Sequence, residues 1–196
     1  MNASPTPSTS KRPPRLCVFC GSRTGHDPVW SSLAEAVGAG IGQRGWDMVF
    51  GAGQIGLMGI VATAARDAGS RITGVIPSYL MTTEVVMRDL DELVEVETMI
   101  ERKIEMSRRA DAFLVLPGGV GTLEELFEVW TGAATYAHEK PLVIANTMGY
   151  FDGLLMYMEE VRDHGFLDDQ HLNQPVVVRD LDAVFQALEA ALSRVG

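Results

Sequence analysis

Short apolar runs alternate with longer amphipathic segments along most of this chain. The runs hold almost no polar residue, which is typical of strands that are covered on both faces. We expect strands at Leu16–Cys20, Met48–Phe50, Ile72–Ile76, Leu93–Val96, Ala112–Leu116, Leu142–Ala145 and Val176–Val178. The segments between them have helical spacing, at Pro28–Arg44, Gly56–Ala68, Thr98–Arg108, Leu123–Tyr136, Phe151–His164 and Leu181–Ser193. This alternation predicts an α/β fold, a Rossmann-like open parallel sheet with helices on both faces.

The length of the chain predicts one domain. With 196 residues and 46% hydrophobic content the chain can bury a full core, and we place a single domain at 15–196. Residues 1–14 are rich in Ser, Thr and Pro and lack the apolar centre of a signal peptide, so we expect a disordered tail. No apolar stretch is long enough to span a bilayer, and we expect no membrane contact.

Charge and cysteine content narrow the functional classes. A net charge of −10 argues against nucleic-acid binding, which needs a basic surface, but it leaves room for a small anionic ligand. Cys17 and Cys20 lie three apart in an apolar run, where a strand points them to opposite faces. There is no second pair to complete a metal site. We therefore expect buried thiols, no metal and a reducing, cytoplasmic location.

The predicted strands are followed by turn residues, as a ligand crevice at the carboxyl ends of parallel strands requires. These turns are Gly21-Ser22-Arg23, Gly51–Gly59, Pro77-Ser78 and Pro117-Gly118-Gly119. Gly51–Gly59 superficially resembles the dinucleotide-binding fingerprint G-x-G-x-x-G. However, it follows the second predicted strand and not the first, and no acidic residue ends the next strand to bind a ribose. We interpret it as close packing of a helix on a strand and as a wall of the pocket.

The run from Leu116 to Glu125 joins a buried strand, a glycine turn and a helix start. Glycines let the backbone come close to a ligand, and the free N–H groups and the dipole of a helix N-terminus favour an anion, so the run predicts a phosphate cradle. Glu124 stands on its rim, and the dipole predicts that it stays ionised. Glu125 suits the dipole equally well, so one carboxylate can be ordinary helix chemistry and the other functional.

A basic pair precedes the cradle, on the predicted helix 98–108. Arg102 is three residues from Met99 and four from Met106, so these side chains share a face. Arg102 is a candidate partner for an anion or a carboxylate. The alternative is an arginine at the helix edge that pairs with Glu101 or Glu105.

Taken together, these segments resemble the LOG family, the cytokinin riboside 5′-monophosphate phosphoribohydrolases that are often mislabelled lysine decarboxylases. The resemblance depends on Glu101-Arg102-Lys103 and on Pro117–Glu125, which has the pattern P-G-G-x-G-T-x-x-E. It runs from about Leu16 to the C-terminus and includes Val18–Ser22, Gly56–Gly59, Gly74–Pro77, His138–Pro141 and Gly149–Phe151.

The resemblance implies hydrolysis of the N-glycosidic bond of N6-modified adenosine 5′-monophosphates, giving free base and ribose 5-phosphate, without a cofactor. Arg102 and Glu124 would be the catalytic pair. The residues assigned to substrate binding are Glu84, Lys103, Gly118, Gly119, Val120, Gly121, Thr122, Leu123 and Thr131. The resemblance also implies a homodimer, which agrees with the large apolar surface of the helices predicted at 98–108 and 123–136. The donor of a proton to the leaving base stays open.

Two segments depart from the family pattern. Gly51-Ala52-Gly53 stands where three glycines are usual, and Gly132–Tyr136 replaces a usual Trp-x-Gln-Leu-Gly. We expect the methyl of Ala52 to narrow the pocket or shift the turn, and the second change to affect base preference or the dimer surface.

Three other functions compete with this one. A pyridoxal phosphate decarboxylase needs a Schiff-base lysine, and among Lys11, Lys103 and Lys140 only Lys103 is placed near the crevice. A general nucleosidase that cleaves AMP or other nucleotide monophosphates, and a non-catalytic carrier of a nucleotide or cofactor, both stay open. A pure carrier has no need for a carboxylate beside its phosphate site.

Overall fold

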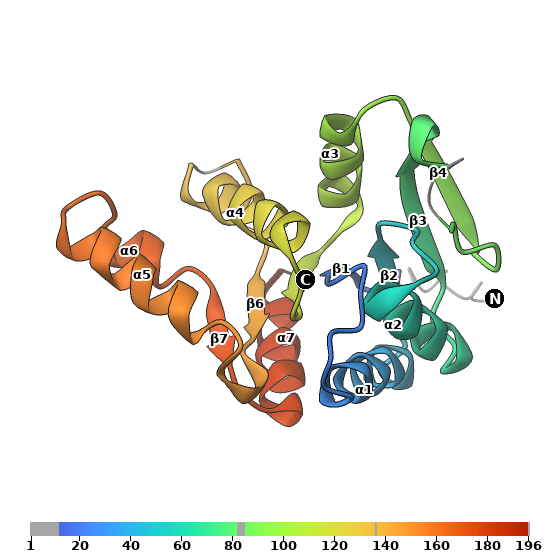
Figure 1. The fold of residues 1–196 in the computed structure, drawn as a ribbon, viewed down its shortest axis with the longest axis horizontal. Helices are drawn as coiled ribbons and strands as arrows, with labels where there is room; N and C mark the ends of the chain where they lie inside the picture. The colour runs from blue at the N-terminus through green and yellow to red at the C-terminus, as the bar shows by residue number, and fades with distance from the viewer. Residues whose placement is uncertain (1–11, 82–84, 136, 196) are drawn as a thin grey trace, which may run out of the picture.

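The computed structural model describes residues 12–81, 85–135 and 137–195. The fold is built around one parallel sheet. Within those ranges it has seven strands in the order β4-β3-β2-β1-β5-β6-β7 (Figure 1). They are β1 (Arg15–Phe19), β2 (Asp47–Phe50), β3 (Ile72–Pro77), β4 (Glu92–Val96), β5 (Ala112–Val115), β6 (Leu142–Ala145) and β7 (Val176–Val178). The predicted fold class is confirmed.

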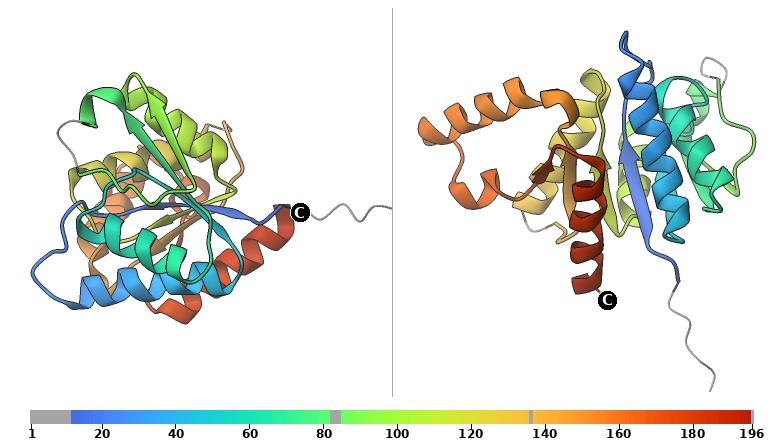
Figure 2. Two further views of the ribbon diagram at one scale, coloured as in Figure 1. Left: turned by 90° about the vertical axis from the view of Figure 1, so that its right-hand side faces the viewer. Right: turned by 90° about the horizontal axis from the view of Figure 1, so that it is seen from below.

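Helices cover both faces of this sheet (Figure 2). On one face α1 (Val29–Gln43), α2 (Gly56–Asp67) and α7 (Leu181–Val195) share a core with alternate strand residues. On the other face lie α3 (Met99–Arg109), α4 (Val120–Ala134) and α5 (Asp152–Asp163). The shorter elements are α6 (Asp169–Leu172), η1 (Ser78–Leu80) and η2 (Thr147–Gly149).

Strand β1 shows why its residues form a central strand. Its side chains alternate between the two cores, so that Cys17 packs on the α3–α4 face and Cys20, just beyond the strand, packs on the α1–α2 face. Both cysteines are free and buried, and burial raises the pKa of each thiol. The prediction of two buried thiols on opposite faces is confirmed.

The chain reverses its direction of winding at β1, which lies between β2 and β5. Such a switch point opens a crevice at the carboxyl ends of the strands. Two backbone hydrogen bonds hold the loops there together. Gly21 N–H donates to the Pro117 carbonyl at 3.0 Å, and Met58 N–H donates to the Gly21 carbonyl at 3.3 Å. The segments that follow β1, β2 and β5 are therefore joined by hydrogen bonds at the edge of the crevice.

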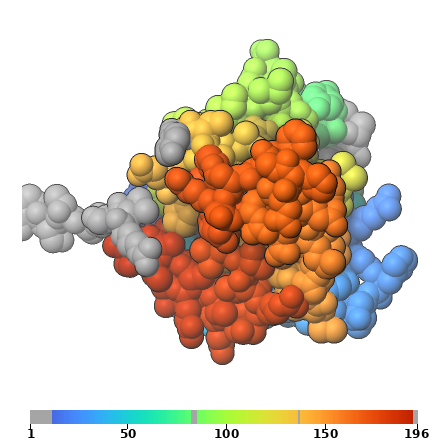
Figure 3. Space-filling model, turned by 90° about the vertical axis from the view of Figure 1, so that its left-hand side faces the viewer, coloured from blue at the N-terminus to red at the C-terminus, as the bar shows by residue number. Residues whose placement is uncertain are grey.

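Most predicted elements begin and end within two residues of the observed bounds, and the larger differences concern α4 and α6. Helix α4 begins at Val120 rather than Leu123, because Gly121 and Thr122 already belong to its first turn. The predicted end, Tyr136, lies outside the described residues. Helix α6 was not predicted, since four residues are too few to show a helical period. Helices α5 and α6, with the segment that joins them, form the surface that is orange in Figure 3.

Two further predictions concern the N-terminal residues and the absence of a membrane-spanning segment. Residues 1–11 lie outside the described part of the chain. Arg12, next in sequence, forms a bidentate ion pair with Asp111, with nitrogen–oxygen distances of 2.6 and 2.8 Å. Among the described residues, none of the helices combines the length and the apolar character that crossing a membrane requires.

Candidate active site

A cavity of about 530 Å³ opens at the switch point, within the usual size of a small-molecule site. Its walls come from the loops after β1 and β5, from the first turns of α2 and α4, and from α3. Leu57 and Met58 of α2 line it, so the interpretation of Gly51–Gly59 as a pocket wall is confirmed for its second half. Trp30 and Tyr150 also line the cavity.

The anion cradle, residues 118–122, consists of the turn before α4 and the first residues of that helix, and it lines one side of this cavity. Gly119 caps the helix without a side-chain hydrogen bond, and among the described residues no acceptor is seen for the N–H groups of residues 119–122. A Cβ on Gly118 would lie 2.1 Å from the Thr122 hydroxyl oxygen, so only glycine fits there. These N–H groups and the helix dipole suit a phosphate.

Arg102 reaches the cavity from α3 and is 5% exposed. Thr98 starts this helix by accepting a hydrogen bond from Glu101 N–H at 3.1 Å. Arg102 Nη2 donates to the Gly51 carbonyl at 2.7 Å, and Nη1 lies 3.5 Å from the Met99 sulfur. Its Nε is buried without a partner in the described structure. The shared face with Met99 is confirmed, and Arg102 does not pair with Glu101 or Glu105.

Lys103 and Glu124 form an ion pair between α3 and α4. Lys103 Nζ lies 2.8 Å from Glu124 Oε1 and also pairs with Glu128. The hydrogen bonds that Lys103 donates to the Glu124 and Glu128 carboxylates raise its pKa. The Glu124 side chain is 57% exposed at the edge of the cavity. Lys103, which was assigned to substrate binding, does not line this cavity and lies instead in the wall of a second cavity between α3 and α4.

Glu125 is the carboxylate that the structure places deeper in the site. It lines the cavity with Arg102, and burial raises its pKa to about 7, while the nearby charge of Arg102 acts in the opposite direction. A carboxyl group whose pKa is close to neutral, and which lies near an arginine and a phosphate cradle, is typical of catalytic sites. The residue predicted from sequence for the catalytic role was Glu124, although the motif P-G-G-x-G-T-x-x-E, counted from Pro117, ends at Glu125.

Three further residues assigned to substrate binding lie apart from the cavity lining or outside the description. Leu123 packs against the core on the α3–α4 face, and Thr131 is exposed on α4, where its carbonyl accepts a hydrogen bond from Thr135. Neither lines the cavity. Glu84 lies outside the described residues. Their contacts with a substrate stay predictions.

The two departures from the family pattern also have a structural place. Ala52 is fully buried with a φ of 62°, and its methyl group faces Gly74 of β3. Ala52 does not line the cavity, so its methyl group fills space beside β3 and does not narrow the pocket. Gly132 lines a second cavity of about 390 Å³ between α3 and α4, together with Ile104, Val129 and Glu125.

A protein family and several curated sequences match most of this chain. Residues 58–188 match the family model described as "possible lysine decarboxylase". A cytokinin riboside 5′-monophosphate phosphoribohydrolase of Mycobacterium marinum is 44% identical over 88% of this chain and 91% of its own length. Its namesake from Mycobacterium tuberculosis is 43% identical over 89% and 91%. One from Arabidopsis thaliana is 43% identical over 81% of this chain and 73% of its own length.

Solved structures share the fold at low sequence identity. The molybdenum cofactor carrier protein of Chlamydomonas reinhardtii is 17% identical, with a TM-score of 0.70 over 93% of this chain and 99% of that protein. A molybdenum cofactor binding protein from the phototrophic bacterium Rippkaea orientalis is 20% identical, with a TM-score of 0.70 over 92% and 98%. At this identity the likeness extends to the fold alone.

Proposed function

Because this chain belongs to the family described as "possible lysine decarboxylase", with phosphoribohydrolases among its relatives, we propose that it hydrolyses N6-modified adenosine 5′-monophosphates. The products would be the free base and ribose 5-phosphate. One observation carries the proposal: a helix N-terminus with open N–H groups shares its cavity with a buried arginine and a carboxyl group whose pKa is raised to about 7.

The proposed mechanism divides the work between the two ends of the cavity. The cradle binds the phosphate, and this remote binding energy positions the ribose. Cleavage of the N-glycosidic bond develops positive charge at C1′, which a carboxylate stabilises. A water molecule adds its oxygen to C1′, and the base leaves with the bonding electron pair and gains a proton. We propose Glu125 as this carboxylate in place of Glu124, with Arg102 orienting it or the ribose hydroxyls.

Glu124 and Lys103 receive a different role in this proposal. Their ion pair joins α3 to α4 at the edge of the cavity, which Glu124 lines and Lys103 does not. It therefore holds together the two helices that supply Arg102 and Glu125. A substitution of Glu124 would weaken this link, whereas one of Glu125 would remove the charge that faces the ribose.

The lysines of the chain do not support amino-acid decarboxylation through a Schiff base. A Schiff-base lysine must lose its proton readily. Lys103 is held by two carboxylates that raise its pKa. Burial lowers the pKa of Lys140, but this lysine donates to the Ser107 carbonyl at 2.6 Å and lines the second cavity, apart from the cradle. Lys11 lies outside the described residues.

An assay with two nucleotides tests the proposal. The protein is incubated with isopentenyladenosine monophosphate and with AMP, and release of free base is followed by chromatography. We expect rapid cleavage of the first, and turnover reduced at least about 100-fold by Glu125→Gln, the loss typical of a catalytic acid or base. Equal rates on both nucleotides would indicate a general nucleosidase. Binding of both without cleavage would indicate a carrier, for which the shared fold is the supporting observation.

We also propose that the protein is a cytoplasmic homodimer. Two free, buried cysteines agree with a reducing compartment. Ile100 and Ile104 expose apolar side chains on α3, beside the apolar cavity between α3 and α4. A second copy of the chain would cover this surface.

A further inference from the structure

Tyr150 makes a direct contact with the anion cradle. It lies in the loop between β6 and α5, and its hydroxyl donates to the Gly118 carbonyl at 2.7 Å. It also lines the cavity and is 44% exposed. Gly149–Phe151 is part of the family resemblance, but the sequence pattern alone indicates no role for Tyr150.

This hydrogen bond fixes the orientation of the peptide that joins Gly118 to Gly119. In a trans peptide the carbonyl and the next N–H point in opposite directions, and the described structure contains no cis peptide. The Gly118 carbonyl is held toward Tyr150, so Gly119 N–H points away from Tyr150. Glycines tolerate many backbone orientations. An outside contact is therefore needed to keep a carbonyl oxygen from turning toward a bound anion.

The loop that carries Tyr150 is firmly built. Asn146 is fully buried, accepts from Phe151 N–H at 2.8 Å, and donates to Asp152 at 2.7 Å. Asp152 in turn pairs with Arg179 at 2.7 Å. These bonds tie both ends of the loop to β6 and α5, so the tyrosine is presented by a rigid support.

Two aromatic contacts fix the ring itself. Trp30 meets the ring of Tyr150 edge to face, with centroids 5.4 Å apart, and Phe151 does so at 4.9 Å. Trp30 belongs to α1, so Tyr150 connects the cradle with elements on both faces of the sheet. The direction of its hydroxyl is thus set before any ligand arrives.

We propose that Tyr150 is a positioning residue that holds the Gly118–Gly119 peptide with its N–H available to the 5′-phosphate. This inference rests on the proposed function, because it assigns the phosphate to the cradle. The loop after β6 thereby contributes to recognition of the phosphate, without touching the base or the reacting carbon. Its effect should appear in binding of phosphorylated ligands and not in binding of an unphosphorylated nucleoside.

The test uses Tyr150→Phe, which removes only the hydroxyl, with Tyr157→Phe as a matched control. Tyr157 is an exposed tyrosine on α5, away from the cavity. Binding of ribose 5-phosphate and of adenosine is measured by titration calorimetry, alongside KM and kcat for the nucleotide. We expect Tyr150→Phe to weaken ribose 5-phosphate binding and to raise KM by about three- to tenfold, the worth of one hydrogen bond. We expect kcat, adenosine binding and the thermal midpoint to stay at wild-type values.

The outcomes separate this inference from the proposed function. If Tyr150→Phe binds ribose 5-phosphate as tightly as the wild type while the enzyme cleaves its nucleotide, the inference is wrong and the proposed function stands. If the variant loses ribose 5-phosphate, adenosine and thermal stability together, Tyr150 has only a structural role. A wild-type protein that binds no ribose 5-phosphate and cleaves no nucleotide would overturn both.

Discussion

Gly51 controls the position of the buried arginine in the site. A Cβ at this residue would lie 1.8 Å from Arg102 Nη2, which donates to the Gly51 carbonyl. We expect Gly51→Ala to displace the guanidinium and lower kcat/KM at least about 100-fold, because small displacements in an active site have effects of that size. Steady-state assays with isopentenyladenosine monophosphate measure the change.

A glycine elsewhere provides the control for this substitution. A Cβ on Gly153 in α5 would meet no neighbouring atom within 4 Å, so Gly153→Ala should keep full activity. Circular dichroism shows whether each variant is folded. A folded Gly51→Ala protein with wild-type turnover would show that the position of Arg102 does not limit the reaction.

The Glu125 carboxyl group should make stability depend on pH. Its pKa in the folded state, about 7, is above its ordinary value of 4.5, so the folded protein binds this proton more tightly than the unfolded chain does. The stabilisation is therefore complete below pH 4.5 and is lost as the pH rises to about 7. We expect wild-type stability to fall over this window relative to Glu125→Gln, by at most about 1.4 kcal/mol per pH unit.

Urea unfolding of both proteins between pH 4 and 9 measures this difference, which should be constant outside the window. Glu124→Gln is the matched variant: it removes a nearby charge that also raises the pKa of Glu125 but leaves the larger effect of burial, so most of the wild-type slope should remain. A constant difference between wild type and Glu125→Gln across the whole range would contradict the raised pKa.

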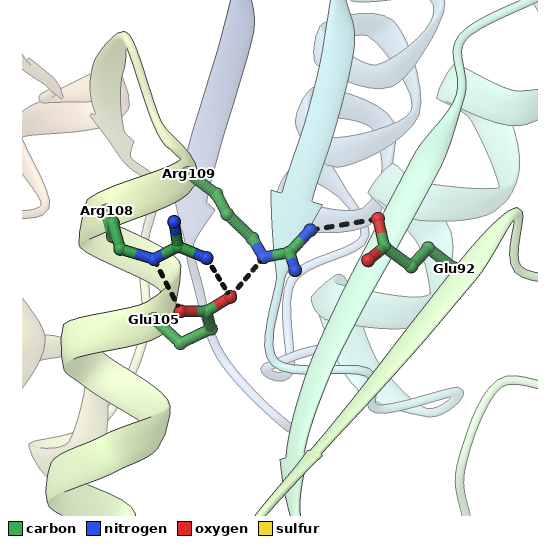
Figure 4. A network of polar contacts seen from close by, with 4 residues as sticks. All are labelled: Glu92, Glu105, Arg108 and Arg109. Carbon is green, nitrogen blue, oxygen red and sulfur yellow. Dashed lines mark hydrogen bonds and ion pairs between the residues drawn. The ribbon is translucent and has the colours of Figure 1, made fainter.

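At the scale of elements, a network of four charged side chains joins α3 to the edge strand β4 (Figure 4). Arg109 lies 2.5 Å from Glu105 on its own helix and 2.9 Å from Glu92 on β4, and its side chain is 17% exposed. Arg108 binds only Glu105 in this network and is 67% exposed. Hydrogen bonds from Arg108, and then from Arg109, lower the pKa of Glu105 to about 2.

The two arginines should therefore differ in their effect on stability. We expect Arg109→Met to lower the free energy of unfolding by about 1–2 kcal/mol, since it breaks the link between helix and strand. Arg108→Met should cost less than about 0.5 kcal/mol, as exposed pairs do. Because the pKa of Glu105 is lowered, its contribution is present above pH 4.5 and is lost as the pH falls toward 2. Equal losses in urea unfolding at pH 7 would contradict this assignment.

The elements themselves were predictable where a period is long enough to be read. The helix at 99–109 and the strand at 142–145 follow from helical spacing and from a continuous apolar run. The start of α4 was not, because glycine spacing does not show whether a turn is helical. The choice between Glu124 and Glu125 was not predictable from helix electrostatics, since both suit the dipole and only packing separates them. The contact of Tyr150 with Gly118 joins residues 32 apart in sequence and leaves no periodic signal.

For the whole molecule, strand order depends on pairings that sequence periodicity does not specify. Turn residues after several strands nevertheless predicted a common crevice, and the cavity at the β1–β5 switch point lies there. The chain carries a net charge of −10, so attraction of an anion must be local. The first turn of α4 and Arg102 supply that attraction within the crevice.

The exposed apolar face of α3 provides a test at the scale of the assembly. Ile100 and Ile104 are 66% and 57% exposed and lie one helical turn apart. If a second copy covers this face, Ile104→Glu places a charge in a desolvated interface and should convert the dimer to a monomer. Sedimentation velocity at tens of micromolar protein, a concentration at which stable dimers persist, measures the change.

Met156→Glu, at a 64% exposed position on α5, is the matched control and should stay dimeric. A wild-type monomer would refute the homodimer, and a monomeric Met156→Glu would place the interface on α5 instead.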